Sequence, residues 1–462
     1  MSALSELAEL LIELKKQEIS EKVEAASRLC LLDAVGAGLF GSTLNEGRKI
    51  VDAVCKLGET SGVSVWGTPV SLNTDNAALV CGAFCHLREL DDVHYAILHP
   101  GAVCVPAAVV TAQREKSKLG DLLVAITAGV EAMVRISKGM DYISHRSRGW
   151  HGTATCGSFG AAAAAGIILG LDQDQMTNAL GLAGSRTGGT WAFKVDGSMS
   201  KRLHPGFAAR DGVLSAYLAS EGISGPRYIL EASDGGFYKV MSDSWNIKTV
   251  NEDNRGIWAV EEIEYKWYAS CKSVHSPLEA AMAIYKENSD RKGKGISHVL
   301  VEVNHSSIEM AGKMYDKKSV VSAQLSIPYG VALGLLGKRG LAEDYALSCL
   351  ENEEVYRLAA KVKVIESAEF NKLRKIEHKS GATVKVVWCD GFEASATVTE
   401  PKGSLANPLQ REDLMEKFHY LSSAAIGGEK ARVLADMIIN GSKDLMTAEL
   451  VQLMTDIRVD VK

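Results

Sequence analysis

The sequence predicts a mainly α-helical protein with a smaller α+β domain, and three observations support this fold class. Apolar residues recur at helical spacing in many segments of residues 3–220. Clear strand-like alternation of apolar and polar residues begins only at Val299 and ends by Val398. Residues 403–462 return to a helical pattern. Because 462 residues are too many for one ordinary hydrophobic core, we expect two domains.

The N-terminal region is expected to begin with two packed helices. Apolar positions in residues 3–40 have helical spacing that breaks near Glu18, which predicts a second helix with Ser20 as its N-cap. Val63–Gly67 is typical of a short extended piece, and Ser71–Phe84 is typical of a helix rich in small residues.

The helices that follow are expected to be buried. Val103–Ala112 is almost entirely apolar, and Gly120–Ile136 is apolar apart from a few residues. Within the second of these, Glu131 and Arg135 stand one helical turn apart, which predicts an ordinary ion pair. The alanine-rich run Phe159–Leu171 has almost no polar residue, so we expect it to be buried on all sides.

The second domain is predicted to be α+β. After Gly225-Pro226 the helical periodicity weakens, and a new helix is predicted to begin with Tyr265–His275. Pro328 predicts the first turn of an apolar helix over Ser322–Leu336. The predicted strands are Val299–Val303, Ala360–Ile365 and a hairpin of Ala382–Trp388 with Glu393–Val398. These elements place the α+β domain at about residues 266–402.

Composition and charge exclude several classes of protein. The 46% hydrophobic and 23% charged content is typical of a soluble globular protein. A net charge of -6, without long Lys/Arg runs, predicts no nucleic-acid partner. Nine scattered cysteines predict a reducing compartment. Cys81 and Cys85 have no second cysteine pair nearby at zinc-finger or iron-sulfur spacing, so they do not predict a metal site. The apolar runs are too short to span a bilayer, and the N-terminus does not have the pattern of a signal peptide, so we expect a cytoplasmic protein without a membrane partner.

One polar stretch, His86–Pro106, lies between two apolar helices, and we interpret it as the centre of an active site. It carries three histidines and three acidic residues: His86, His94, His99, Glu89, Asp91 and Asp92. Loops held between rigid buried helices often carry catalytic residues. A structural alternative is that the acidic residues cap the next helix and that His99-Pro100-Gly101 forms an ordinary turn.

Two further segments carry candidate site residues. His151 is predicted to lie at the mouth of the buried alanine-rich helix, where free N–H groups favour anions. The alternative is a histidine that is hydrogen-bonded as a helix-entry residue. Lys201–Gly206 together with Arg210 concentrates cationic side chains in a globally acidic chain. A solvated basic turn is the alternative for this segment.

Five separated motifs, in the same order, resemble the MmgE/PrpD family, which includes 2-methylcitrate dehydratase, cis-aconitate decarboxylase and iminodisuccinate epimerase. The motifs are Leu90-Asp91-Asp92 with His99-Pro100; Gly149-Trp150-His151 with Ser158–Ala162; Lys201 with Leu203-His204 and Ala208-Ala209; Lys266 with Ser270-Cys271 and His275; and Gln324 with Ser326 and Tyr329. The resemblance covers nearly the whole chain.

The resemblance implies an architecture and an assembly. A large helical domain would be built from both chain ends, residues 1–265 and 403–462, and residues 266–402 would form an α+β lid domain. The family resemblance also implies a homodimer and a site between the domains that uses neither a metal nor another cofactor. His99, His151 and Lys201 match positions that line the family's active site, and Asp91 and Asp92 match its acidic pair.

The chain departs from the family's decarboxylases and dehydratases at particular positions. Val93 follows the acidic pair where the decarboxylase has threonine, Glu89 replaces an aspartate, and Cys271 replaces a histidine. These differences argue against cis-aconitate decarboxylation. The dehydratase's long insertion between the acidic pair and the His-Pro motif is missing, which argues against a strict 2-methylcitrate dehydratase.

The residues favour proton transfer at a carbon next to a carboxylate. Asp91, His99, His151 and Lys201 are the predicted catalytic residues, with the two histidines moving protons and Lys201 anchoring a carboxylate. The predicted substrate-binding residues are Glu89, Asp92, His204, Arg210, Cys271 and His275. The leading hypothesis is a hydro-lyase for a small di- or tricarboxylic hydroxy acid. An epimerase of a dicarboxylic acid and a catalytically silent acid-binding helical dimer are the alternatives.

Overall fold

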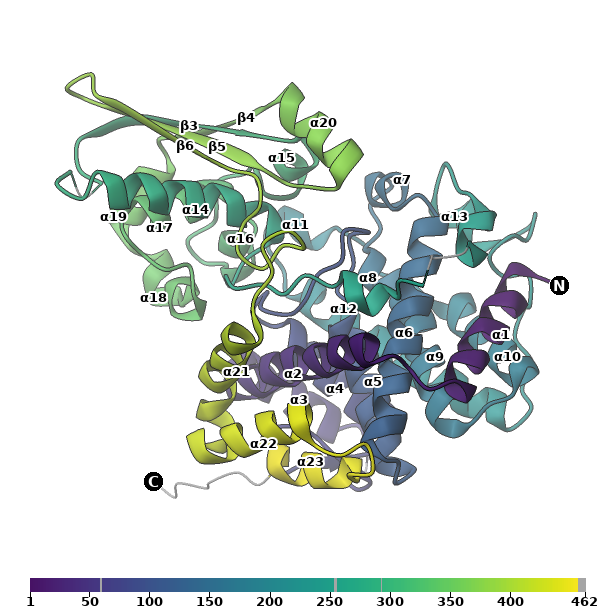
Figure 1. Ribbon diagram of the computed structural model, residues 1–462. Helices are drawn as coiled ribbons and strands as arrows, with labels where there is room; N and C mark the ends of the chain where they lie inside the picture. Colours follow the sequence, from purple (N-terminus) through teal and green to yellow (C-terminus); the bar gives the residue numbers. More distant parts are fainter. Residues whose placement is uncertain (59, 253–255, 292, 456–462) are drawn as a thin grey trace.

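The computed structural model describes residues 1–58, 60–252, 256–291 and 293–455. It contains a large helical part and a smaller part with a four-stranded sheet, which is drawn at the upper left of Figure 1. The predicted fold class, mainly α with a smaller α+β part, is therefore confirmed.

The helical part contains the elements between residues 3 and 262 and, near the C-terminus, the helices α21, α22 and α23. Its α-helices are α1 Ala3–Lys16, α2 Glu21–Thr43, α3 Asn45–Cys55, α4 Thr74–His86, α5 Gly101–Arg114, α6 Leu119–Gly139, α7 Tyr142–Ser147, α8 Gly152–Thr155, α9 Gly157–Leu169, α10 Gln173–Arg186, α11 Phe193–Asp196, α12 Ser200–Ser220, α13 Phe237–Met241, α21 Arg411–Ile426, α22 Gly428–Asn440 and α23 Thr447–Thr455. The 3₁₀ helices η1 Ile247–Asn251 and η2 Ala259–Glu262 and the short strands β1 Val63–Ser64 and β2 Ser71–Leu72 complete this part.

Several predicted helices are confirmed with their capping residues or internal pairs. The Ser20 side chain accepts a hydrogen bond from the backbone N–H of Val23 at 3.3 Å and so caps α2. Glu131 and Arg135 form the predicted i, i+4 pair at 2.5 Å within α6. The predicted helix over Ser71–Phe84 begins later, because its first two residues belong to β2.

The alanine-rich helix α9 is buried inside the helical part. It packs against α5, α6, α10 and α12. By length and composition, Gly152–Leu169 is apolar enough to cross a membrane, but 89% of this segment is buried inside the protein. The buried environment that the alanine-rich sequence predicts is thus provided by neighbouring helices.

The close crossing of α4 and α12 brings two of the predicted site segments together. A Cβ atom on Gly206 would lie only 2.2 Å from the backbone oxygen of Leu79, so these helices approach at a glycine. A solvated basic turn was the alternative that the sequence left open for Lys201–Gly206. The structure excludes this alternative, because the segment lies within α12, which continues through Pro205, and Lys201 is buried.

The sheet-containing part follows in the chain from residue 272. Its elements are α14 Lys272–Glu287, β3 Ile296–Val303, α15 His305–Ala311, α16 Val320–Gln324, α17 Ile327–Leu335, η3 Ala342–Tyr345, α18 Leu347–Leu350, α19 Glu353–Ala359, β4 Val362–Glu366, α20 Ala368–Glu377, β5 Ala382–Trp388 and β6 Glu393–Val398. The strand order is β4-β3-β5-β6, with β3 and β4 parallel and the other neighbours antiparallel.

One face of the sheet packs on helices. Figure 1 shows α14 and α17 beneath the strands, and α14 contacts β5 and β6. Along β5, buried residues alternate with more exposed ones, as in a sheet with one covered face. The predicted strands and hairpin are confirmed. The helix predicted over Ser322–Leu336 is instead interrupted at Leu325, and the Ser326 side chain caps α17 at the Tyr329 N–H.

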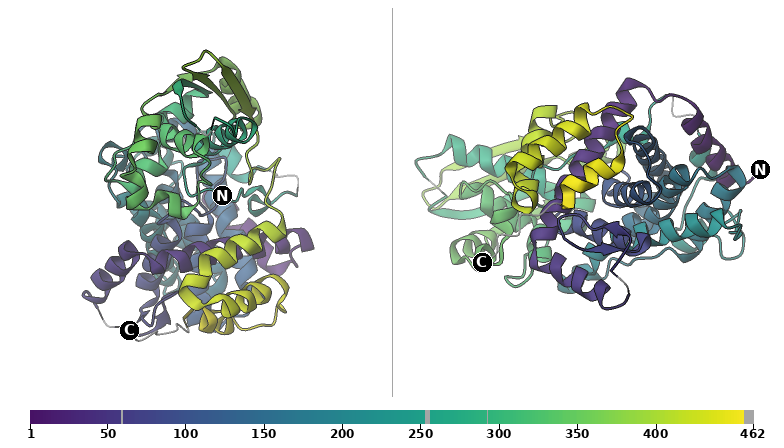
Figure 2. Two further views of the ribbon diagram at one scale, coloured as in Figure 1. Left: turned by 90° about the vertical axis from the view of Figure 1, so that its left-hand side faces the viewer. Right: turned by 90° about the horizontal axis from the view of Figure 1, so that it is seen from below.

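The chain returns from the sheet to the helical part before α21. Figure 2 shows α21 to α23 beside the N-terminal helices, and α21 packs on α2. The helix predicted to begin with Tyr265–His275 begins only at Lys272. Residues 263–271 instead run as irregular backbone toward the α4–α5 loop, where Glu264 forms an antiparallel bridge with Val93.

Candidate active site

A cavity of about 300 Å³ lies between the helical and the sheet-containing parts. The helical part contributes His99, His151 and Lys201 to its wall, and the sheet-containing part contributes Lys272 and Arg374. The volume is at the lower end of the range for small-molecule sites. Side chains from both parts therefore meet around one space that has room for a small metabolite.

The loop between α4 and α5 forms the floor beneath this cavity. Glu89 and Ile97 have positive φ angles of 54° and 60°, which is an uncommon backbone conformation for residues other than glycine. The Asp92 carboxylate accepts hydrogen bonds from the Gly101 N–H at 3.0 and 2.8 Å and so caps α5. Burial raises the pKa of Asp92 well above its usual value. The predicted structural alternative for the acidic residues thus applies to Asp92.

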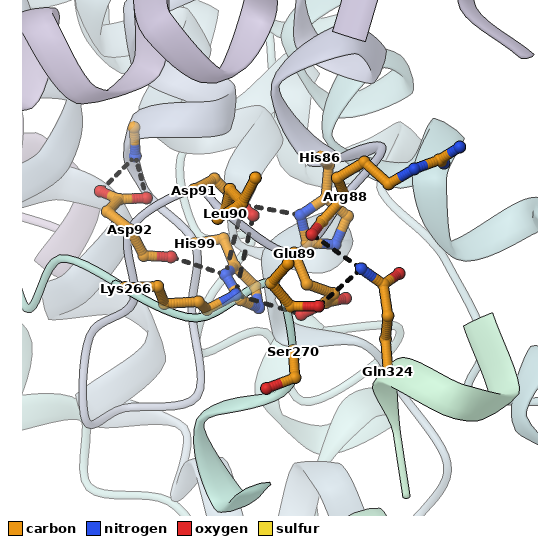
Figure 3. Close-up of polar contacts among 12 residues, drawn as sticks. His86, Arg88, Glu89, Leu90, Asp91, Asp92, His99, Lys266, Ser270 and Gln324 are labelled. Carbon is orange, nitrogen blue, oxygen red and sulfur yellow. Dashed lines mark hydrogen bonds and ion pairs between the residues drawn. The ribbon is translucent and has the colours of Figure 1, made fainter. Parts of the chain in front are cut away.

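Glu89 is the hub of a buried ion cluster. It binds three cations, which are Lys201, Arg202 at 2.5 Å and Lys266 at 3.1 Å. Figure 3 shows Lys266 reaching Glu89 from a separate loop. Burial alone would raise the pKa of Glu89, but the three cations hold it well below the usual range. Glu89 is therefore an ionised carboxylate that fixes the positions of these cationic groups.

Asp91 lies next to this cluster and joins it to the histidines. Its carboxylate contacts His86 Nδ1 at 2.6 Å, His99 Nδ1 at 3.3 Å and Lys266 Nζ at 3.7 Å (Figure 3). Although burial would raise its pKa, His86 and Lys266 lower it below the usual value. Two ionised carboxylates thus face the three cations of the cluster, and the excess positive charge favours an anion in the adjoining cavity.

His99 presents a basic nitrogen to the cavity. Its Nδ1 lies 2.7 Å from the backbone oxygen of Asp92. A carbonyl oxygen only accepts hydrogen bonds, so Nδ1 carries the proton and, in the neutral ring, Nε2 carries the lone pair. Burial, with Lys266 nearby, lowers the pKa of His99 well below 6.5. The ring is therefore neutral at pH 7, and its Nε2 can accept a proton.

His151 lies across the cavity, with its ring centroid 6.4 Å from that of His99. It precedes the short helix α8, and its backbone N–H donates to the Gly189 oxygen at 3.0 Å. Its Nδ1 lies 2.9 Å from Nδ1 of His204. Burial lowers the pKa of His151 well below 6.5, and it lowers that of His204 to about 4. Both rings are therefore neutral without a ligand.

Three of the imidazoles are close enough to be considered as metal ligands. His86, His99 and His151 offer ring nitrogens within 4.8 Å of one another. Among the described residues, these three form the cluster whose ligand atoms are close enough to share a metal ion. Burial lowers the pKa of all three, and the positive charge of Lys201 lowers it further. A cation would experience the same repulsion, so the surroundings favour an anionic ligand over a metal ion.

The structure brings most of the sequence-predicted site residues together. Glu89, His99, His151, Lys201 and Cys271 line the cavity. Asp91 and His204 lie directly behind it, in contact with His99 and His151 respectively.

Three further predicted substrate-binding residues are not on the cavity wall, and Asp92, which caps α5, is the first of them. Arg210 is partly exposed on α12, 3.6 Å from Asp75, and it is not on the cavity wall. His275 is fully buried, and its Nε2 donates to the backbone oxygen of Ser270 at 3.2 Å. These positions do not line the cavity, so a substrate contact from them stays a prediction.

Sequence reasoning did not select several residues that contribute to the site. Arg202 and Lys266 complete the cluster around Glu89, Lys272 adds a cation to the cavity wall, and Trp191 packs against His151. Lys272 Nζ lies 3.7 Å from Glu264 and has no hydrogen bond to the described residues. Lys266 belongs to a motif noted in the sequence, so its position could have been proposed, whereas Trp191 had no signal of its own.

Comparison with known proteins gives matches over nearly the whole chain. The MmgE/PrpD N-terminal domain model matches residues 5–250, and the MmgE/PrpD C-terminal domain model matches residues 268–440. Cis-aconitate decarboxylase from Aspergillus terreus is 28% identical over 447 residues, which cover 92% of this chain and 90% of that protein. The Homo sapiens cis-aconitate decarboxylase is 26% identical over 450 residues, covering 92% and 89%. Escherichia coli 2-methylcitrate dehydratase is 23% identical over 382 residues, covering 79% and 78%.

Proposed function

The chain belongs to the MmgE/PrpD family, and from this premise we propose that it is a lyase for a small di- or tricarboxylic acid. The similarity to a decarboxylase and a dehydratase supports lyase chemistry in general. We further propose that the reaction is dehydration of a hydroxy acid. The observation that carries this proposal is the neutral His99 ring, which has its Nδ1 proton fixed and its Nε2 free at the cavity wall, where Lys201 also lies.

His99 is the base in the proposed reaction. Its Nε2 takes the proton from the carbon next to a substrate carboxylate, and the electron pair of the C–H bond moves into that carboxylate. Lys201 stabilises the charge that develops there. The His99 imidazolium that forms would have the Asp91 carboxylate 3.3 Å from its Nδ1. A nearby carboxylate favours the charged ring, which suits a group that must gain a proton.

His151 is the acid. Burial lowers its pKa most, and His204, Lys201, His86 and His99 are the neighbouring groups that lower it further. None of these is a carboxylate, so the protonated ring is disfavoured and gives up its proton readily. The negative charges of a bound di- or tricarboxylate raise the pKa of His151 and allow Nε2 to carry a proton. The C–O bond then breaks, the hydroxyl takes this proton and leaves as water, and the electron pair forms the carbon–carbon double bond.

Decarboxylation is the second candidate, because cis-aconitate decarboxylases match more than nine-tenths of the chain. It would require a proton to be delivered to carbon, and the free neutral His99 does not carry one at Nε2. Val93 and Cys271, where the resemblance implies threonine and histidine in the decarboxylase, both line the cavity. The cavity wall therefore lacks two polar side chains that the resemblance implies for the decarboxylase. Their absence favours dehydration over decarboxylation.

Turnover of a panel of acids tests this proposal. Malate, citrate, 2-methylcitrate and cis-aconitate would be incubated with the protein in deuterium oxide and followed by proton NMR and by the ultraviolet absorbance of a conjugated alkene. We expect alkene formation from a hydroxy acid. Release of carbon dioxide from cis-aconitate would favour the second candidate, and exchange with inversion but no alkene would contradict dehydration.

The matched variant for this test is His99→Asn. The asparagine amide can still donate to the Asp92 carbonyl, but it has no basic nitrogen in place of Nε2. We expect kcat to fall by a factor of about 10²–10⁴, as for loss of a general base. A His99→Asn protein that turns over the same acid at the wild-type rate would exclude His99 as the base.

A further inference from the structure

The hydrogen bond between His151 and His204 joins two buried rings through the same type of atom. The two Nδ1 atoms are 2.9 Å apart, with ring centroids at 5.1 Å. Two neutral imidazoles can make such a bond only if one Nδ1 carries a proton and the other accepts it. The tautomers of the two rings are therefore linked. The bond occupies Nδ1 of His151 in either case, and its direction decides whether Nε2 of the neutral His151 ring carries a proton.

The surroundings of the pair keep this bond in place. Trp191 meets the His151 ring edge to face, with centroids at 5.1 Å, and Phe193 contacts both histidines at 5.9 Å. A Cβ on Gly189 would lie 2.4 Å from the Ala154 side chain, so the 187–193 loop closes tightly over the pair. With His151 only 1% exposed, water competes poorly for its Nδ1.

We propose that His204 is a positioning residue that accepts a hydrogen bond from Nδ1–H of His151 and so makes Nε2 the nitrogen that exchanges protons with the substrate. This inference rests on the proposed function. The protonated ring carries hydrogens on both nitrogens, so a partner at Nδ1 must then be an acceptor. If His204 also accepts from the neutral ring, His151 can gain and lose its Nε2 proton without a change of tautomer or orientation.

A histidine in this role has a consequence that a carboxylate would not have. A carboxylate at this position would stabilise the protonated His151 ring and make it a weaker acid. The neutral acceptor orients His151 but stabilises its cation less. The pair therefore fits a group that must release a proton to a leaving hydroxyl, and it differs from His99, which has Asp91 beside it.

Three variants of His204 test this inference. In His204→Asn the side-chain oxygen can take the place of Nδ1 and accept the hydrogen bond, whereas His204→Gln carries the same amide one bond too far and His204→Leu has no acceptor. We expect kcat to fall about 100-fold or more in the Gln and Leu variants and less than about tenfold in the Asn variant, with KM within about threefold in all three. Equal loss in the Asn and Gln variants, or wild-type kcat in the Leu variant, would overturn the inference.

A measurement that is independent of turnover separates failure of this inference from failure of the proposed function. The protein labelled with ¹⁵N-histidine would be studied by NMR, with His151→Asn used to assign the His151 signals. We expect a protonated Nδ1 and an unprotonated Nε2 on His151 in the wild type, and loss of this preference in His204→Leu. The opposite tautomer would refute the inference even if the protein dehydrates an acid. The expected tautomer together with no turnover of any acid would refute only the proposed function.

Discussion

Replacing Glu89 with glutamine tests whether the buried ion cluster is held together by charge. The side chain is 1% exposed, and its two oxygens bind Lys201, Arg202 and Lys266. Glu89→Gln keeps the size and shape of the side chain but removes its negative charge. Asp91 is then the remaining carboxylate of the cluster that opposes the three cations. Removal of one partner from a buried ion pair typically costs about 3–5 kcal/mol, because the other charge remains buried. Since proteins are stable by about 5–15 kcal/mol, we expect a large loss in the free energy of unfolding.

The assay is urea unfolding followed by tryptophan fluorescence at neutral pH, with Glu46→Gln as the matched control. Glu46 pairs with Arg88 at 3.1 Å with 26% of its side chain exposed, so we expect this control to lose at most about 1 kcal/mol. Succinate should restore more stability to Glu89→Gln than to the wild type, because its charges can compensate the excess cations. If Glu89→Gln lost no more stability than the control, the cluster would not have the energetic role described.

Three further predictions concern other parts of the molecule. Gln324→Ala should cost about 1–3 kcal/mol, measured by the same unfolding assay, because the Gln324 side chain accepts from Arg202 at 2.7 Å and donates to two backbone oxygens at 2.7 and 2.8 Å. Arg210→Gln should leave kcat and KM within about twofold, since Arg210 lies off the cavity wall; a large rise in KM would contradict this. Stability should fall as the pH decreases from 6.5 toward 4, because burial lowers the pKa of His86, His145 and His204 to about 4 in the folded protein. The unfolded chain then binds protons first, so each histidine contributes a loss of about 1.4 kcal/mol per pH unit, and a flat pH profile of unfolding would refute these assignments.

The elements predicted best from the sequence are those that a few neighbouring residues define, such as a turn motif between alternating strands or an N-cap residue in front of a helix. The β5–β6 hairpin was predicted with the bounds that the structure has, because alternation and a Cys-Asp-Gly turn define both strands. Ser20 was identified as an N-cap from one residue in front of an apolar run. In contrast, the sequence left a basic turn over Lys201–Gly206 open as an alternative. α12 continues through Pro205 there, since close packing against α4 maintains a helix that local preference disfavours.

The site was predictable as a set of residues but not as a geometry. His99, His151 and Lys201 could be selected from motifs in separate segments, and they line one cavity. The sequence could not show that Nδ1 of His99 donates to a backbone oxygen, because that contact depends on the path of the loop. It also placed Arg210 with Lys201 because they are close in sequence, although nine positions along a helix turn the two side chains toward different surroundings.

The most direct test of the account is deuterium exchange at the carbon next to the carboxylate of an acid that the protein turns over, in wild type and in His99→Asn. We predict that the wild type exchanges this hydrogen with deuterium oxide and that His99→Asn, folded and able to bind the acid, exchanges it at least about 100-fold more slowly. Undiminished exchange in His99→Asn, or turnover by the wild type without cleavage of this C–H bond, would contradict the central claim that Nε2 of His99 removes the proton.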